Sequence, residues 1–260
     1  MQATVGSHCL ECAKASRPDL ATRARFWNAR QPALVTLVLM AINVGVFVYL
    51  VARDPLALTG REITLGHWQL GLNDAGLGDG FAGRLPDGGV YVSPGGQWYR
   101  LVTSGFVHFG IIHLAFNMYL LYVLGQMLEP QVGRVKYLLV YLAALLGGSA
   151  GSLLLDNGSL AGGASGAVFG LMALAFVGYY LHGANPFSTS IGTLLMLNLF
   201  VTFFFPGISI GGHIGGAVAG GLCALAVMAP RWKSVPSWAG YVAPIVVGAL
   251  SVGIAVVTVG

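Results

Sequence analysis

The sequence has few charged residues. Only 8% of its 260 residues are charged, whereas a soluble domain carries roughly a quarter. Hydrophobic residues make up 56% of the chain, and the mean hydropathy is +0.76. This composition excludes an ordinary soluble domain and predicts a protein that lies in a membrane.

The basic residues are too scattered to form a nucleic-acid-binding face, although the net charge is +4. No nucleic-acid partner is therefore expected. Several of them precede the first apolar run, which indicates a cytoplasmic N-terminus. These residues are Lys14, Arg17, Arg23, Arg25 and Arg30.

Cysteine is also scarce, with three residues in the chain, so no disulfide framework is expected. Cys9 and Cys12, beside His8, resemble half of a zinc site. A closed structural site needs four ligands, and a second pair is missing from the sequence. Three interpretations remain open: a remnant, a truncated start, or a site completed by a partner. No bound metal is predicted.

Apolar runs of about 20 residues, enough to cross a bilayer, recur along the chain. They predict an all-α, polytopic membrane helix bundle with about seven transmembrane helices. The first run follows a long polar segment, so we expect it to be retained as a span and not cleaved as a signal peptide. The runs cover roughly residues 33–52, 109–128, 135–155, 165–181, 188–205, 208–228 and 241–259.

A cytoplasmic N-terminus places nine of the 13 basic residues on the inner side, as the positive-inside rule requires. The other four lie in residues 53–100, where acidic residues offset them. This loop, rich in Gly and Pro, is expected to be external and partly ordered on the membrane surface. The second, fourth and sixth spans then all run from outside to inside.

Polar side chains occur in the opening turns of these three spans. His113 and Asn117 are in the second, Ser165 begins the fourth, and His213 is in the sixth. A rise of about 1.5 Å per residue places all four at similar depth. Polar groups at this depth are costly and often mark function, although they also serve as hydrogen bonds between helices. A nucleophile, a base and two donors together favour catalysis.

The local sequence around these residues suits acyl transfer. His113 and Asn117 are spaced i, i+4 and share one helical face. Ser165 follows Gly163 and Ala164 at a helix start, where unpaired N–H groups could bind an oxyanion. We therefore expect Gly163 and Ala164 to contribute to oxyanion or substrate binding.

Glycines surround His213 on its span. Gly212, Gly216 and Gly220 form a small-xxx-small ridge for close helix packing. Close packing is also what a histidine needs to take the proton of a serine.

A carboxylate to complete a triad is missing, because no Asp or Glu follows Asp156. Asp156 itself begins an Asp-Asn-Gly sequence that is typical of an external turn. The sequence therefore predicts a Ser165–His213 dyad.

Five short motifs within about residues 98–230 resemble those of the rhomboid proteases. The resemblance implies Ser165 as nucleophile, His213 as general base and then acid, and an oxyanion hole of His113, Asn117 and the Ser165 N–H. It implies a structural role for Glu129. The motifs are Tyr99-Arg100, His108, His113-Leu-Ala-Phe-Asn117, Gly163-Ala164-Ser165-Gly166 and His213-Ile-Gly-Gly216.

Three departures from the family pattern occur. Gly212 stands where alanine is frequent, Phe169 where some members have tyrosine, and a seventh helix follows the core. The first two are conservative in packing, and the third indicates the six-plus-one form. The expected division is a cytoplasmic segment 1–31, a protease core 32–230 including the external loop, and a linker with an additional helix, 231–260.

The resemblance also implies a reaction and a location. It implies hydrolysis of peptide bonds in or near the transmembrane helix of single-span membrane proteins, without metal or organic cofactor. The site would face outward in a bacterial inner membrane, with lipid as the surroundings. The sequence specifies no oligomeric state.

Two other functional classes fit the sequence less well. A non-enzymatic relative that binds membrane clients usually lacks the serine or the histidine, and this chain keeps both. A transporter would need ionisable residues along a full crossing path, often within duplicated halves. Here the polar set stays in one half of the membrane, and no internal repeat is evident.

Overall fold

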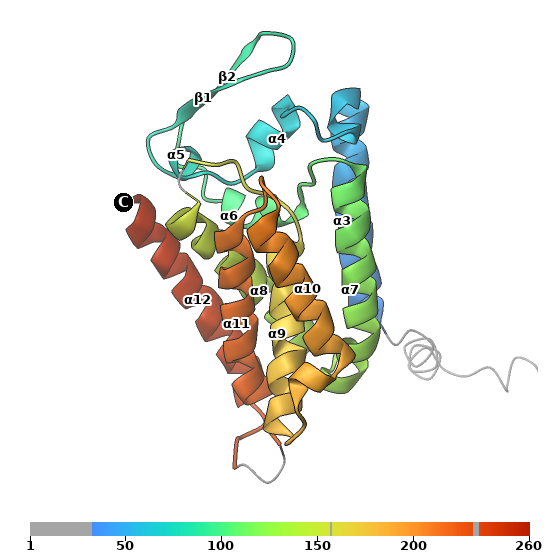
Figure 1. The fold of residues 1–260 in the computed structure, drawn as a ribbon. Coiled ribbons are helices and arrows are strands. Elements are labelled where there is room, and N and C mark those ends of the chain that lie inside the picture. The colour runs from blue at the N-terminus through green and yellow to red at the C-terminus, as the bar shows by residue number, and fades with distance from the viewer. Residues whose placement is uncertain (1–32, 157, 231–233) are drawn as a thin grey trace, which may run out of the picture.

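The computed structural model describes residues 33–156, 158–230 and 234–260. The N-terminal segment with Cys9 and Cys12 lies outside the described residues. The described chain folds as a helix bundle (Figure 1), and five of its helices are long and apolar enough to cross a membrane. Two shorter apolar helices lie among them. The predicted all-α membrane bundle is confirmed.

Each predicted apolar run coincides with one helix, within a few residues at either end. The helices are α3 Leu34–Arg53, α7 Ile111–Val132, α8 Arg134–Leu155, α9 Ser165–Leu181, α10 Ser190–Phe204, α11 Ile210–Val227 and α12 Ala239–Val259, with the 3-10 turn η3 Pro186–Ser188 before α10.

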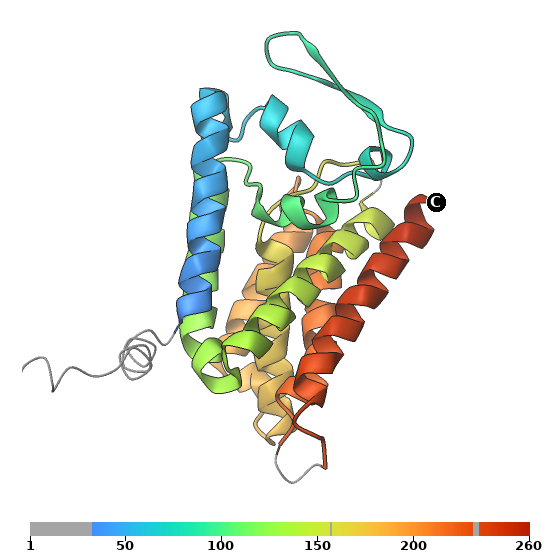
Figure 2. The same ribbon diagram turned by 180° about the vertical axis from the view of Figure 1, so that it is seen from behind.

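Residues 54–110 gather at one end of the bundle, called the loop end below (Figures 1 and 2). Helices α7, α9 and α11 all begin at this end and run away from it. The predicted topology requires these three helices to begin at the same end of the bundle, and they do.

The loop segment is partly ordered, as expected. Buried Arg100 anchors it, because its guanidinium donates to the carbonyl of Trp68 at 2.6 Å and to Gln97 Oε1 at 2.7 Å. Strand β1 pairs antiparallel with β2, Phe81 opposite Ser93. The segment holds η1 Pro55–Leu58, α4 Leu65–Leu70, α5 Asp74–Leu77, β1 Phe81–Arg84, β2 Val90–Ser93, α6 Arg100–Thr103 and η2 Ser104–Phe106.

Helix α11 packs backbone to backbone against α9. A β-carbon on Gly216 would overlap the carbonyl oxygen of Gly166, and one on Gly220 would overlap that of Gly170. These two positions confirm the predicted ridge. Gly212, the third predicted member, instead lies against Ser209 of its own helix start.

A second glycine face on α11 meets α8. A β-carbon on Gly211 would overlap the carbonyl oxygen of Gly151, and one on Gly215 would overlap that of Gly147. Helices α8, α9 and α11 therefore form one closely packed core, which fixes where α9 and α11 begin.

Glu129 joins α3 and α7 at the end of the bundle opposite the loop end. Its carboxylate accepts hydrogen bonds from the backbone N–H groups of Val35 and Thr36, each at 2.9 Å. Unpaired N–H groups at a helix start need such acceptors. The contact caps α3 and holds it against α7.

Candidate active site

Gly163 shapes the turn that leads into α9. Its φ of +128° lies in a region that side-chain-bearing residues rarely adopt. A β-carbon at this position would lie 2.9 Å from Nε2 of His113 and 3.7 Å from Oγ of Ser165. The histidine of α7 and the serine of α9 therefore flank the same small space, which glycine leaves open. Ala164 is fully buried beside it.

His213 lies against the same face of α9 as Ser165, the first residue of that helix. The ring of Phe169 stacks on that of His213, with centroids 4.1 Å apart and planes 17° apart. Phe169 stands one helical turn after Ser165, and residues so spaced share a face. A β-carbon on Gly166 would also lie 3.2 Å from the carbonyl oxygen of Gly212. The residues next to Ser165 and His213 are thus in contact.

The Ser165 side chain is half-buried and makes no hydrogen bond within the part of the chain that the structure describes. Serine and histidine in a site without substrate commonly stand beyond bonding distance and approach when substrate binds.

His113 and Asn117 occupy one face of α7, as predicted. The backbone N–H of Phe109 donates to Nδ1 of His113 at 3.3 Å. Since a neutral imidazole carries one proton, Nε2 holds it and is a donor toward the space at Gly163. Asn117 is buried and donates one amide proton to the His113 carbonyl at 3.0 Å. Its second amide proton remains available.

His108 lies just before α7 and is fully buried. Burial, and secondarily the nearby His113, lowers the pKa of His108 to about 3. Its Nε2 has no hydrogen-bond partner among residues 33–156, 158–230 and 234–260. This histidine is therefore neutral at ordinary pH and packs at the junction of the loop segment and the core.

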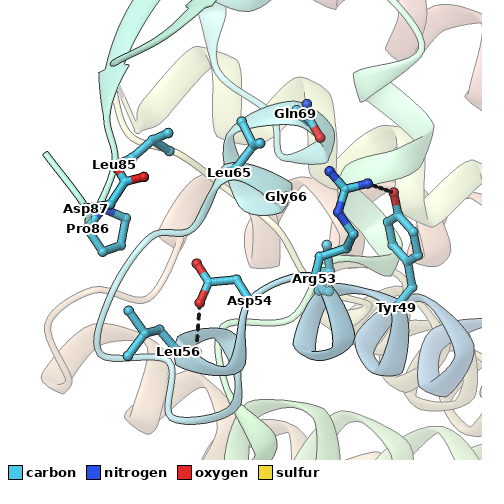
Figure 3. Close-up of a pocket in the computed structure, with 11 residues that line it drawn as sticks. Tyr49, Arg53, Asp54, Leu56, Leu65, Gly66, Gln69, Leu85, Pro86 and Asp87 are labelled. Carbon is cyan, nitrogen blue, oxygen red and sulfur yellow. Dashed lines mark hydrogen bonds between the residues drawn. The ribbon is translucent and has the colours of Figure 1, made fainter. Parts of the chain in front are cut away.

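Two hollows differ sharply in size. Ser165, with Gly163 and Gly212, lines one of about 40 Å³. A larger one, of about 420 Å³, lies between the end of α3, helix α4 and the β1–β2 turn (Figure 3). None of the predicted site residues lines it. The described residues also contain no group of three or more His, Cys, Asp or Glu placed to hold a metal ion.

The similarity to known proteins covers the part of the chain that contains these helices. The family model for the rhomboid domain matches residues 95–230, slightly more than half of the chain. The chain belongs to the rhomboid family. The matched range starts shortly before the helix of His113 and ends after that of His213.

Curated relatives share this rhomboid domain. Rhomboid protease GluP of Bacillus subtilis (strain 168) is 39% identical over 141 residues, 52% of this chain and 27% of that protein. Rhomboid-type serine protease 2 of Emericella nidulans is 32% identical over 157 residues, 56% of this chain and 31% of the relative. RHOMBOID-like protein 6, mitochondrial, of Arabidopsis thaliana is 34% identical over 134 residues, which are 50% of this chain and 43% of that protein. The chain thus covers less than half the length of each.

The side chain of Asp156 has a role in this rhomboid bundle that the sequence did not reveal. The chain bends there, as expected, but the carboxylate accepts hydrogen bonds from Ser209 Oγ at 2.5 Å and from the Gly211 N–H at 3.1 Å. It caps the start of α11, the helix of His213. The carboxylate does not bond the imidazole itself, so it does not complete a triad.

Thr202 of α10 makes a contact with His213 that was likewise not evident from the sequence. Its Oγ1 lies 2.7 Å from Nδ1 of His213, and both side chains are buried. A threonine within an apolar run carries no signal that would have identified this contact beforehand.

Proposed function

We propose that this rhomboid-family chain is an intramembrane serine endopeptidase, in which Ser165 is the nucleophile and His213 the general base. The observation that carries the proposal is the space at Gly163, which lies between Nε2 of His113 and Oγ of Ser165. A carbonyl carbon attacked by the serine would place its oxygen near the histidine donor there. The names of the curated relatives, which are rhomboid and serine proteases, support the same reaction.

In the proposed reaction, Ser165 Oγ attacks the scissile carbonyl carbon while His213 Nε2 takes the hydroxyl proton. Negative charge then develops on the carbonyl oxygen. His113 Nε2–H, the free amide proton of Asn117 and the Ser165 N–H donate hydrogen bonds to it, with Gly163 and Ala164 forming the adjoining backbone.

His213 next gives its proton to the departing amine, and the peptide C–N bond breaks. A water molecule then attacks the acyl-serine ester, its proton again taken by His213. The ester C–O bond then breaks, His213 returns the proton to Ser165 Oγ, and the second product leaves as a carboxylic acid. No group outside the protein and water is required.

The substrates that we propose are single-span membrane proteins cut in or near their transmembrane helix. A helical peptide has its carbonyl groups in backbone hydrogen bonds, so the substrate must unwind locally before attack. We further propose a cytoplasmic N-terminus, which places the loop end at the external face of a bacterial inner membrane. The basic residues before the first span and the neutralised charge of residues 53–100 support this orientation.

The decisive test is cleavage of a single-span model substrate by the protein in liposomes. Ser165→Ala and His213→Ala should abolish cleavage, and Asn117→Ala should slow it about tenfold or more. Ser159→Ala, an exposed serine six positions earlier, is the matched control and should cleave normally. Labelling by a fluorophosphonate, read by mass spectrometry, should fall on Ser165. Normal cleavage by Ser165→Ala would refute the proposal.

A further inference from the structure

Thr202 makes two short contacts that together determine the direction of its hydroxyl proton. Its Oγ1 lies 2.7 Å from the carbonyl oxygen of Asn198, one turn earlier on α10, and 2.7 Å from Nδ1 of His213. Thr202 is 1% exposed and His213 is 8% exposed, so the protein shields this pair from competing partners.

A hydroxyl has one proton to donate, and a carbonyl oxygen can only accept. Both contacts of Thr202 are satisfied only if its proton goes to Asn198 and its oxygen accepts from Nδ1–H of His213. A neutral imidazole has a single N–H. Nε2 of His213 is then unprotonated, with its lone pair free to act as a base.

We propose that Thr202 is a positioning residue that holds His213 in the Nδ1–H tautomer and so exposes Nε2 to Ser165. This inference rests on the proposed function and adds the group that orients the base. A triad carboxylate performs this task in other serine hydrolases. Here no Asp or Glu follows Asp156 in the sequence, and the Asp156 carboxylate is bonded at the start of α11.

The stacking of Phe169 completes the restraint. Phe169 holds the plane of the imidazole from α9, and Thr202 holds one nitrogen from α10. Because both the plane of the ring and the position of Nδ1 are fixed, Nε2 can point in only one direction.

The two histidines of the site are consequently held in opposite tautomers. The Phe109 N–H occupies Nδ1 of His113, which leaves Nε2–H as a donor. Thr202 accepts from Nδ1–H of His213, which leaves Nε2 as an acceptor. One histidine is set to stabilise negative charge and the other to remove a proton.

The first test measures the tautomer without reference to activity. Protein labelled with ¹⁵N in its histidine rings is studied by NMR in detergent, and the His213 signals are assigned from a His213→Gln sample. The wild type should show Nδ1 protonated and Nε2 unprotonated. A wild type with predominantly Nε2–H at His213 would overturn the inference without any variant having to fold.

The second test compares three variants of α10. Thr202→Val keeps the shape and removes the hydroxyl, Thr202→Ser keeps the hydroxyl, and Thr193→Val is the matched control. Thr193 lies on the same helix, is exposed, and bonds its own i−4 carbonyl but no histidine. Thr202→Val should mix the tautomers of His213 and lower kcat by roughly 10- to 100-fold with KM little changed. Thr202→Ser and Thr193→Val should both retain the wild-type tautomer and rate.

These outcomes separate the inference from the proposed function. If Thr202→Val kept the Nδ1–H tautomer and the wild-type kcat, the positioning role would be wrong while a serine–histidine mechanism could stand. If Ser165→Ala cleaved normally, the proposed function would fail regardless of the NMR result. A Thr202→Val variant with a lowered kcat but an unchanged tautomer would make Thr202 a packing residue and overturn the inference.

Discussion

The α8–α9–α11 core and the loop segment 54–110 are built on opposite principles. In the core, helices meet at glycines whose neighbours leave no room for a β-carbon. In the loop segment, short helices and a hairpin are joined by side-chain hydrogen bonds, among them those of Trp68, buried Arg100 and Thr103. The larger hollow belongs to the loop segment, whereas Ser165 and His213, the proposed nucleophile and base, lie in the opening turns of core helices α9 and α11. The proposed site therefore does not coincide with the larger hollow.

The core determines the positions of the proposed nucleophile and base. Ser165 and His213 lie at the starts of two helices whose separation is fixed by backbone contacts. We therefore expect substitutions to become less damaging from the core outward.

The largest effect is expected at Gly216. Its Ala variant would force a β-carbon into the Gly166 carbonyl, which should lower the free energy of unfolding by about 3 kcal/mol and abolish cleavage. Gly221→Ala on the same helix is the matched control, since its β-carbon would meet only Val177 and Ala173 at 3.8 and 3.9 Å. Thermal unfolding in detergent measures both. Equal stability of the two variants would contradict backbone packing as the determinant.

A smaller effect is expected at the end of the core, where Asp156 caps α11. Asp156→Ala removes two hydrogen bonds to a charged acceptor, which should cost about 2 kcal/mol of stability and lower kcat through a shifted His213. Asp156→Asn keeps the shape and one acceptor, so it should fall between the wild type and the Ala variant. If Asp156→Ala unfolded and cleaved as the wild type does, the cap would not contribute to the position of α11.

The junction of the two regions should be sensitive to acid. Burial first, and His113 second, lowers the pKa of His108 from 6.5 to about 3. Between these values the unfolded chain binds a proton that the folded chain excludes, so stability falls as pH drops below 6.5. From pH 7 to 5 the loss should be on the order of 1 to 2 kcal/mol.

The check is the unfolding temperature at both pH values. His108→Gln should lose less stability on acidification than the wild type, whereas His182→Gln, an exposed histidine at the end of α9, should behave as the wild type does. An identical pH response in the wild type and His108→Gln would show that His108 is not the group responsible.

The helices could be predicted because their apolar runs are long and bounded by glycine or polar residues. Helix α9 begins at Ser165 and ends at Leu181, as predicted. Helix α7 was expected to end near residue 128 but continues through Pro130 to Val132. It ends where Gly133 adopts a φ of 85°, a conformation that commonly terminates helices.

The candidate site could be predicted only in part. The sequence identifies His113, Asn117, Ser165 and His213 as candidates because such side chains are costly within a membrane, and their catalytic roles stay predictions. Asp156 and Thr202 were not. A carboxylate in an Asp-Asn-Gly sequence looks like a turn residue, and a threonine that bonds its i−4 carbonyl looks like any threonine in a helix. Their hydrogen-bond partners at α11 are brought close only by tertiary packing, which the local sequence does not reveal.

The smallest effect is expected at Arg53, beside the larger hollow (Figure 3). Its exposed guanidinium donates to the hydroxyl of Tyr49 at 3.1 Å, a contact in water that contributes little. Arg53→Ala should therefore change the free energy of unfolding by no more than about 0.5 kcal/mol and leave cleavage unaltered. Arg100→Ala, which removes the buried arginine of the loop segment, should destabilise the protein far more. If Arg53→Ala slowed cleavage while stability held, the hollow would belong to the substrate path, and the functional separation of loop segment and core would be wrong.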